Sequence, residues 1–505
     1  MFTFLCPALR PVFNQGRKTM LSKKLIVRAG LSCAALGFIS GAVLADDADA
    51  ILKRAAAAMG EPKTIRYVAE GTGYTYGQAF LPGTAWPKIM VHSMIRTINY
   101  DTASMREEIT LSRAEPKGGG GYPLAGQQRN DQFVSGNLAW NMAGSNVQPG
   151  PRFINDRVHQ LWITPHGVIK AAMKNKATVS FSTSKDGKSV AAVKFTEPGK
   201  FIATAFINES YLVERVESRL PDPVVGEVAA VTTYGDYRDV SGSKFPTHIR
   251  QSQGGFPVLD VNVKEVQPDA SADIKVPELV EKYSERVLAE KVTEGVWHIA
   301  GGSHNSVAIE MKDHMVLVEA PLNDGRSGPV IEQVNKLVPG KPIRFMINTH
   351  NHFDHAGGVR TAAASGLTIV TQAGNKAYFE KNLAARNTIA PDLLTKSKKK
   401  AKIVTVGDKM EMKDATRSIE IHRVKDGVHN DTFLMVYLPK EKLLIEADAY
   451  TPLPPNAPVP ATPNANHVNL IDNIERLKFD VTKILPLHGR VVPVGELYAT
   501  ASRKR

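Results

Sequence analysis

The chain has 505 residues, of which 43% are hydrophobic, so it can form globular cores and is too long for one ordinary domain. Its formal net charge is +13, but six of these charges lie in the first 45 residues, which contain no acid, and the rest carries a modest +7. Because no nucleic-acid-binding motif accompanies this charge, composition argues against a nucleic-acid partner.

Residues 1–45 have the pattern of a secretory signal peptide. Lys23, Lys24 and Arg28 form a basic region, an apolar run of small residues follows, and Val43-Leu44-Ala45 gives a cleavage site. The run is too short for a typical membrane span, so we expect a periplasmic or secreted protein with no stable membrane insertion after cleavage. A retained anchor is the alternative. If Met20 is the start, residues 1–19 are not translated.

The two cysteines, Cys6 and Cys33, both lie in the predicted leader. The exported chain would therefore contain no disulfide and no thiolate metal ligand.

Residues 46–265 are predicted to form an antiparallel β-rich domain. A helical pattern at 48–59 precedes many alternating polar and apolar segments, such as 91–100 and 212–220, which Gly, Asn and Pro clusters separate. The segment 234–249 weakly resembles the curved-sheet periplasmic carrier domains. A polar linker is expected at 266–285 and a second domain at 286–505.

A cluster of metal-ligand side chains stands in the second domain at His350-Asn351-His352-Phe353-Asp354-His355. Imidazole and carboxylate are ligands for zinc and similar ions. The cluster follows a short buried strand at 344–348. In extended backbone His350, His352 and Asp354 would share one side and His355 would point elsewhere, which can divide the ligands between two ions.

Three more ligand-type residues stand in turns beside predicted strands. His429 precedes the strand 433–438, Asp448 follows 442–446, and His488 follows 481–485. Strand ends are where a rigid scaffold presents side chains to a cleft.

This order of ligands resembles the metallo-β-lactamase superfamily over residues 286–505. The resemblance implies an αββα sandwich, so the whole chain is expected to be α+β, with the β-rich domain first. It also implies that His350, His352 and His429 hold one zinc ion, that Asp354, His355 and His488 hold a second, and that Asp448 bridges them, as in glyoxalase II-like members. Glu319 departs from the Asp that many members have, without touching the ligand set.

These ligands predict a zinc-dependent hydrolase of small molecules. A metal-bridging hydroxide would attack an ester, thioester, lactone or lactam carbonyl, with Asp354 orienting the nucleophile. The alternatives are a periplasmic ligand-binding or carrier protein with a non-catalytic metal site, and an iron-dependent persulfide oxygenase. Substrate identity and oligomeric state stay open. His304 and His467 are candidates to line the cleft, and His298, His314 and His422 are expected to be structural.

Overall fold

The computed structural model describes residues 45–114, 126–183, 187 and 189–503, and Val43–Arg505 form one compact unit. The predicted signal peptide, residues 1–45, lies outside the described residues except for Ala45, where the first helix begins. Among the described residues, none of the helices has the length and apolar character needed to cross a membrane.

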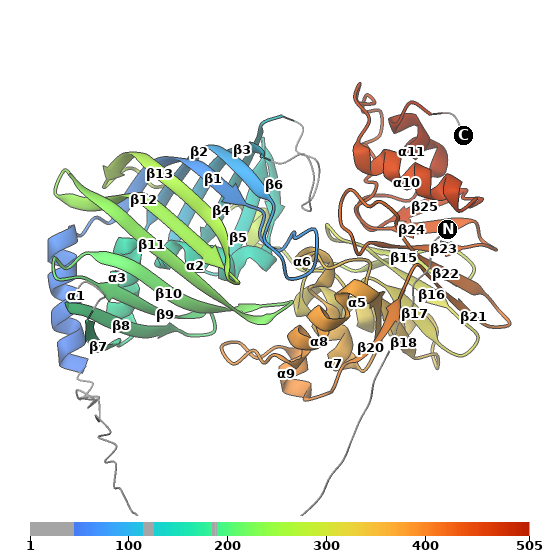
Figure 1. The fold of residues 1–505 in the computed structure, drawn as a ribbon, viewed down its shortest axis with the longest axis horizontal. Coiled ribbons are helices and arrows are strands. Elements are labelled where there is room, and N and C mark those ends of the chain that lie inside the picture. The colour runs from blue at the N-terminus through green and yellow to red at the C-terminus, as the bar shows by residue number, and fades with distance from the viewer. Residues whose placement is uncertain (1–44, 115–125, 184–186, 188, 504–505) are drawn as a thin grey trace, which may run out of the picture. The chain divides into compact units, whose positions relative to one another are not determined.

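The first part of the described chain forms one antiparallel sheet. Its edge strands, β6 and β7, lie midway between its first and last strands in the sequence. Its spatial order is β6-β5-β4-β3-β2-β1-β13-β12-β11-β10-β9-β8-β7, so the first and last strands pair at its centre (Figure 1). The strands are β1 Thr64–Tyr74, β2 Lys88–Asn99, β3 Ser104–Arg113, β4 Gln128–Ser135, β5 Leu138–Ala143, β6 Asn146–Pro149, β7 Thr178–Thr183, β8 Ser189–Glu197, β9 Phe201–Ile207, β10 Val213–Asp222, β11 Gly226–Val240, β12 Ser243–Gln253 and β13 Phe256–Pro268.

One face of this sheet packs against helices and forms the first hydrophobic core. The helices are α1 Ala45–Met59, η1 Pro151–Phe153, α2 Ile154–Trp162 and α3 Pro165–Lys174. Along β9, every second residue is buried, as the two-residue period of a strand requires. Leu52 of α1 and Val168 of α3 belong to the same core as Phe201 of β9. The β-rich region predicted from alternation is thus confirmed.

Two further sheets follow. The first has the order β14-β15-β16-β17-β18-β19-β20 and is antiparallel up to β17 and parallel from there on. The second has the order β21-β22-β23-β24-β25-β26. The strands are β14 Leu288–Thr293, β15 Val296–Ala300, β16 Ser306–Glu310, β17 Met315–Val318, β18 Ile343–Ile347, β19 Thr368–Gln372, β20 Lys402–Val406, β21 Lys409–Lys413, β22 Ser418–Arg423, β23 Leu434–Leu438, β24 Leu443–Glu446, β25 Lys483–Pro486 and β26 Val492–Pro493.

These two sheets pack on each other and carry helices outside. The helices are α5 Asp324–Leu337, α6 Phe353–Ala356, α7 Val359–Ser365, η2 Ala373–Asn375, α8 Lys376–Ala384, α9 Leu393–Ser397, α10 Ala465–Arg476 and α11 Val494–Thr500. The short helix α4 Glu278–Glu281 precedes them and lies beside β5 and β6 of the first sheet. Val316 and Val318 of β17 join the core shared with the second sheet, whereas Met315 and Leu317 join the core under α5 and α7. This layering confirms the predicted αββα sandwich and the α+β class.

The predicted linker is partly structured. β13 runs to Pro268, residues 269–277 carry neither helix nor strand, and the single-turn helix α4 follows before β14. The boundaries at 265 and 286 stay predictions.

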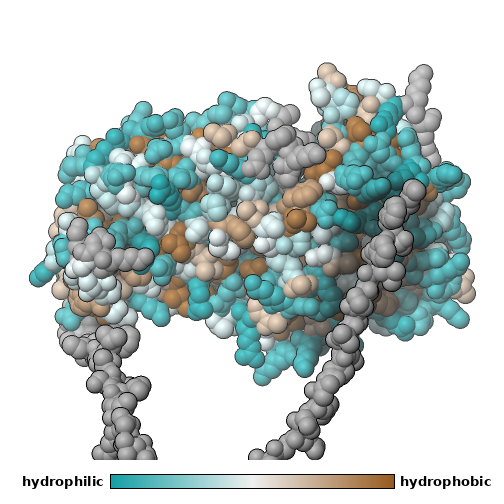
Figure 2. Space-filling view, in the orientation of Figure 1, coloured by the Kyte–Doolittle hydropathy of each residue, from teal (hydrophilic) through white to brown (hydrophobic). Residues whose placement is uncertain are grey.

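Hydrophobic residues on the face drawn in Figure 2 are scattered among hydrophilic ones and do not gather into one large patch. Apolar side chains exposed singly are normal on a soluble surface. This face therefore gives no sign of a large apolar docking surface.

Candidate metal centre

The ligand-rich turn begins where β18 ends. Residues up to His352 are extended or irregular, and Phe353–Ala356 then form the single-turn helix α6, whose N-terminal flanking residue is His352. The expected alternation of side chains thus stops at Phe353, because Asp354 and His355 stand on a helical turn. A Cβ on Gly358 would lie 2.0 Å from Ser327 Oγ and 2.4 Å from the Ala320 carbonyl oxygen, so only glycine allows this close packing of the turn.

The other three ligand-type residues lie in the turns that the sequence predicts. His429 precedes β23, Asp448 follows β24, and His488 follows β25, which runs parallel to β24. All seven candidate ligands come together at the ends of these strands.

The first group of donors consists of His350, His352, His429 and Asp448, whose ligand atoms all lie within 4.8 Å of one another. His429 Nε2 is 2.9 Å from His352 Nδ1 and 3.0 Å from Asp448 Oδ2. The ring of His350 is completely buried, and its Nε2 is 3.7 Å from Asp448 Oδ2.

The second group consists of Asp354, His355, His488 and, unexpectedly, His304. His355 Nε2 and His488 Nε2 are 3.1 Å apart, and each lies 2.9 Å from Asp448 Oδ1. His304 Nε2 is 3.2 Å from Asp354 Oδ2. Asp448 therefore turns one carboxylate oxygen to each group.

Outer hydrogen bonds fix the proton positions on several of these rings. His488 Nδ1 donates to the carbonyl oxygen of Ser303, and His355 Nδ1 donates to the carboxylate of Glu319. The hydroxyl of Thr349 donates to Glu319 and accepts from His350 Nδ1. In each ring Nε2 is then left with a lone pair that points into the centre.

These lone pairs make the centre fit a cation. His355 Nε2, His488 Nε2 and Asp448 Oδ1 are mutual neighbours near 3 Å, and when both rings are neutral and the outer bonds are satisfied all three are acceptors. His350 Nε2 is buried without a hydrogen bond among the described residues. Two donors on one tetrahedral zinc ion lie about 3.3 Å apart, given Zn–N bonds of about 2.0–2.1 Å. The donor set therefore fits two zinc-like ions.

Burial and the neighbouring charges shift the pKa values of these side chains. Burial lowers the pKa of His352 to about 3 and the pKa of His304 to about 3, so both rings are neutral. Burial also opposes the charge on His355, but the carboxylates of Asp448 and Asp354 outweigh it and raise the pKa of His355 well above its usual value. Although burial disfavours the Asp448 carboxylate, His355 and His488 hold the pKa of Asp448 well below its usual range. Positive charge is thus stabilised where the second group lies.

Three residues near the centre extend or correct the sequence analysis. His304 belongs to the second donor group. Glu319, for which the sequence predicted no contact, lies directly against the ligand His355. Gln78 of the first sheet region donates from its side-chain amide to Asp354 Oδ1 at 2.8 Å. No sequence motif predicted the contact of Gln78 with Asp354, because the two residues are 276 positions apart in the chain.

The remaining histidines lie apart from the donor groups. His467 hydrogen-bonds to Thr500 Oγ1 at 2.8 Å, and His298 hydrogen-bonds to the carbonyl oxygen of Pro486 at 3.2 Å. His422 pairs with Glu420, and His314 pairs with Asp313.

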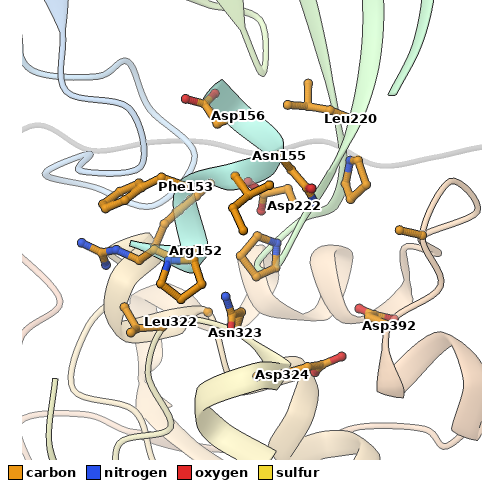
Figure 3. A pocket seen from close by; sticks show the side chains of 18 of the residues that line it. Arg152, Phe153, Asn155, Asp156, Leu220, Asp222, Leu322, Asn323, Asp324 and Asp392 are labelled. Atoms are coloured by element: carbon orange, nitrogen blue, oxygen red, sulfur yellow. The ribbon is translucent and has the colours of Figure 1, made fainter. Parts of the chain in front are cut away.

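A cavity of about 660 Å³ opens beside the second donor group and has Asp354 in its wall. Side chains from the start of α2, such as Asn155 and Asp156, surround it together with Leu322 and Asn323 from the turn before α5 (Figure 3). Cavities of about 300–1,000 Å³ hold small-molecule ligands.

Parts of the chain are similar to known proteins. Residues 299–471 match the family model described as the metallo-beta-lactamase superfamily. A metallo-beta-lactamase from Hirschia baltica is 20% identical, with a TM-score of 0.33, over 43% of this chain and 99% of that chain. One from Pontibacter korlensis is 17% identical, with a TM-score of 0.33, over 43% and 98%. Rubredoxin oxygen:oxidoreductase from Desulfovibrio gigas is 13% identical, with a TM-score of 0.34, over 42% and 59%.

No curated protein matches the chain. The family-model match over residues 299–471 lies within the C-terminal part of the chain, where the sequence resembles the metallo-beta-lactamase superfamily.

Proposed function

We propose that the protein is an exported hydrolase that holds two zinc ions and cleaves an ester, thioester, lactone or lactam bond in a small molecule. One observation carries the proposal, which is that the two carboxylate oxygens of Asp448 face two separate groups of imidazole and carboxylate donors. The first ion would be held by His350, His352 and His429, and the second by Asp354, His355 and His488, with Asp448 between them. We add His304 to the second set.

When bound, the ions would supply Lewis acidity, which lowers the pKa of water toward about 7 and polarises a carbonyl group. The chain's own groups would hold the reactants. Asp354 is fixed on Oδ1 by Gln78, and its Oδ2, which faces the second donor group, would hold the second ion and orient the attacking water beside it. Tyr76, Phe153 and Phe353 give the adjoining cavity apolar surface for the rest of the substrate.

The two alternative functions find less support. A carrier would need room between the first sheet and its helices, and one cavity there among the described residues, lined by Tyr67, Phe245 and Ile249 among others, measures about 20 Å³. That volume is about enough for one water molecule. A persulfide oxygenase would use one iron ion and fewer ligands than the two groups offer.

Metal analysis and a substrate panel test the proposal. The purified protein should contain about two zinc ions per chain and hydrolyse at least one chromogenic lactam, lactone, ester or thioester. A chelator should abolish turnover, and added zinc should restore it. A single iron ion would favour the oxygenase. A folded protein that takes up no metal would exclude both enzymatic functions.

Replacing His304 with asparagine tests its place among the ligands. Because His304 Nε2 lies 3.2 Å from Asp354 Oδ2, the variant should bind the second ion at least about 10-fold more weakly and the first ion normally. Cobalt titration of the apoprotein, followed by visible absorption, separates the two binding steps. His298→Asn is the matched control, since His298 is a buried histidine outside both donor groups. Two unchanged cobalt affinities in His304→Asn would remove His304 from the ligand set.

A further inference from the structure

The loop between β1 and β2 of the first sheet, residues 75–87, runs against the ligand turns of the metal centre. We call it the strap. Its base is closed by a hydrogen bond from the Thr75 backbone to the Pro87 carbonyl oxygen at 2.9 Å.

The strap reaches the two turns that carry the histidines of the first group. The carbonyl oxygen of Ala79 accepts hydrogen bonds from the side-chain amides of Asn351 and Asn430, each at 3.2 Å. Asn351 stands between His350 and His352, and Asn430 follows His429. A single backbone carbonyl of the strap thus joins the two turns. The neighbouring carbonyl of Phe80 accepts from the backbone of Asp431 at 3.2 Å.

The strap also holds the turn of the second group. The backbone of Phe353, between the ligands His352 and Asp354, donates to the carbonyl oxygen of Gly77 at 3.0 Å. The Phe353 ring lies against two strap aromatics, with centroid distances of 5.2 Å to Tyr76 and 5.7 Å to Trp86. Such edge-to-face pairs each add about 0.5–1.5 kcal/mol beyond the burial of area.

Gly77 permits this close approach. Its φ is +80°, and a Cβ there would lie 2.8 Å from Cβ and Cγ of Phe353. Any other residue would therefore be strained and would push the strap away from the ligand turn.

Gln78 makes the contact that touches a ligand. Its amide donates to Asp354 Oδ1 at 2.8 Å, while Asp354 Oδ2 faces His304 Nε2. A carboxylate on a surface turn can rotate, and Asp354 is the least enclosed member of its group together with His488. The amide fixes its plane and leaves Oδ2 directed at the second donor group.

From these contacts we propose that the strap is a working part of the metal centre, and that Gln78 is a positioning residue that orients Asp354 for the second ion. The first sheet is then required for complete metal loading. This inference rests on the proposed two-ion function. The inference goes beyond that function because it assigns a role at the metal centre to a region outside residues 299–471, which match the family model.

The test is cobalt titration of apoprotein from the wild type, Gln78→Ala and Gln132→Ala. Gln132 lines the same cavity, and the described residues show no contact between it and a ligand, so it is the matched control. Gln78→Ala should bind the second cobalt ion about 10–100-fold more weakly, the cost typical of losing a partner that orients a metal ligand. The first cobalt affinity and the melting temperature of the apoprotein should stay at wild-type values, as should both affinities in Gln132→Ala.

Gly77→Ala gives a second, independent perturbation, because its added methyl group moves the strap without removing the amide. Gly77→Ala should also lower the affinity for the second cobalt ion and leave the first affinity unchanged. The inference is overturned if Gln78→Ala binds both ions as the wild type does, or if both affinities fall together with the apoprotein melting temperature, which would mark a purely structural role. A wild-type protein that binds no cobalt would instead overturn the proposed function and this inference with it.

Discussion

His352→Ala is expected to lose the first metal ion and to lower turnover by well over about 100-fold, the upper end of what losing an outer partner of a metal site costs. His352 is completely buried, and its Nδ1 lies 2.9 Å from His429 Nε2 within the first donor group. Alanine removes one of the donors of this group. Metal content by atomic emission and turnover of the best substrate from the panel measure the two effects.

His422→Ala is the control for this experiment. His422 is also buried in the C-terminal part, but it pairs with Glu420 and belongs to neither donor group. That variant should keep two ions and most of its activity, even if its melting temperature falls. Should His352→Ala retain both ions and full turnover, the first donor group would not be a metal site.

Much of the centre could be predicted from sequence because its ligands are concentrated. Six consecutive residues carry four candidate ligands, and the buried strand before them, predicted at 344–348, forms as β18. His429, Asp448 and His488 were recognisable as the ligand-type residues in turns beside short apolar strands. Their convergence follows from the sandwich, which brings the ends of β18, β24 and β25 to one place.

The contacts that sequence could not predict are those made between distant segments. Gln78 is an ordinary amide in a loop of the first sheet, and only the fold places it on Asp354. His304 stands in a Gly- and Ser-rich turn that any surface loop could have. The helical turn of α6 also escaped prediction, because three alternating ligands up to Asp354 read as extended backbone. Local pattern determines which side chains are available, whereas packing determines which of them meet.

Glu319 also shows the difference between local pattern and packing, because the sequence predicts only that it lies at the end of β17. Its side chain is completely buried, with Oε1 accepting from the Asn348 amide at 3.1 Å and Oε2 accepting from Thr349 Oγ1 and from His355 Nδ1. One carboxylate thus ties the ligand-bearing turn to the neighbouring strand. It also holds the proton of His355 on Nδ1, which keeps Nε2 free for a metal ion.

Glu319→Ala should therefore damage both the fold and the centre. Four buried donors, one of them the Thr349 backbone, would lose their acceptor, and breaking such a buried charged network costs about 3–5 kcal/mol in the free energy of unfolding. The second cobalt ion should bind about 10–100-fold more weakly, because the His355 ring would lose the partner that orients it. Urea unfolding of the apoprotein measures the first effect and cobalt titration the second.

Two companion variants make this result specific. Glu319→Gln keeps the side-chain volume and one oxygen acceptor, so it should lose less stability than alanine while still weakening the second ion. Glu420→Ala removes the carboxylate from another histidine pair, where His422 Nε2 lies 2.8 Å from Glu420 Oε2, outside both donor groups. It should leave both cobalt affinities unchanged. If the free energy of unfolding of Glu319→Ala lies within about 1 kcal/mol of the wild-type value, and the variant binds two ions as tightly as the wild type, the carboxylate neither supports the turn nor orients His355.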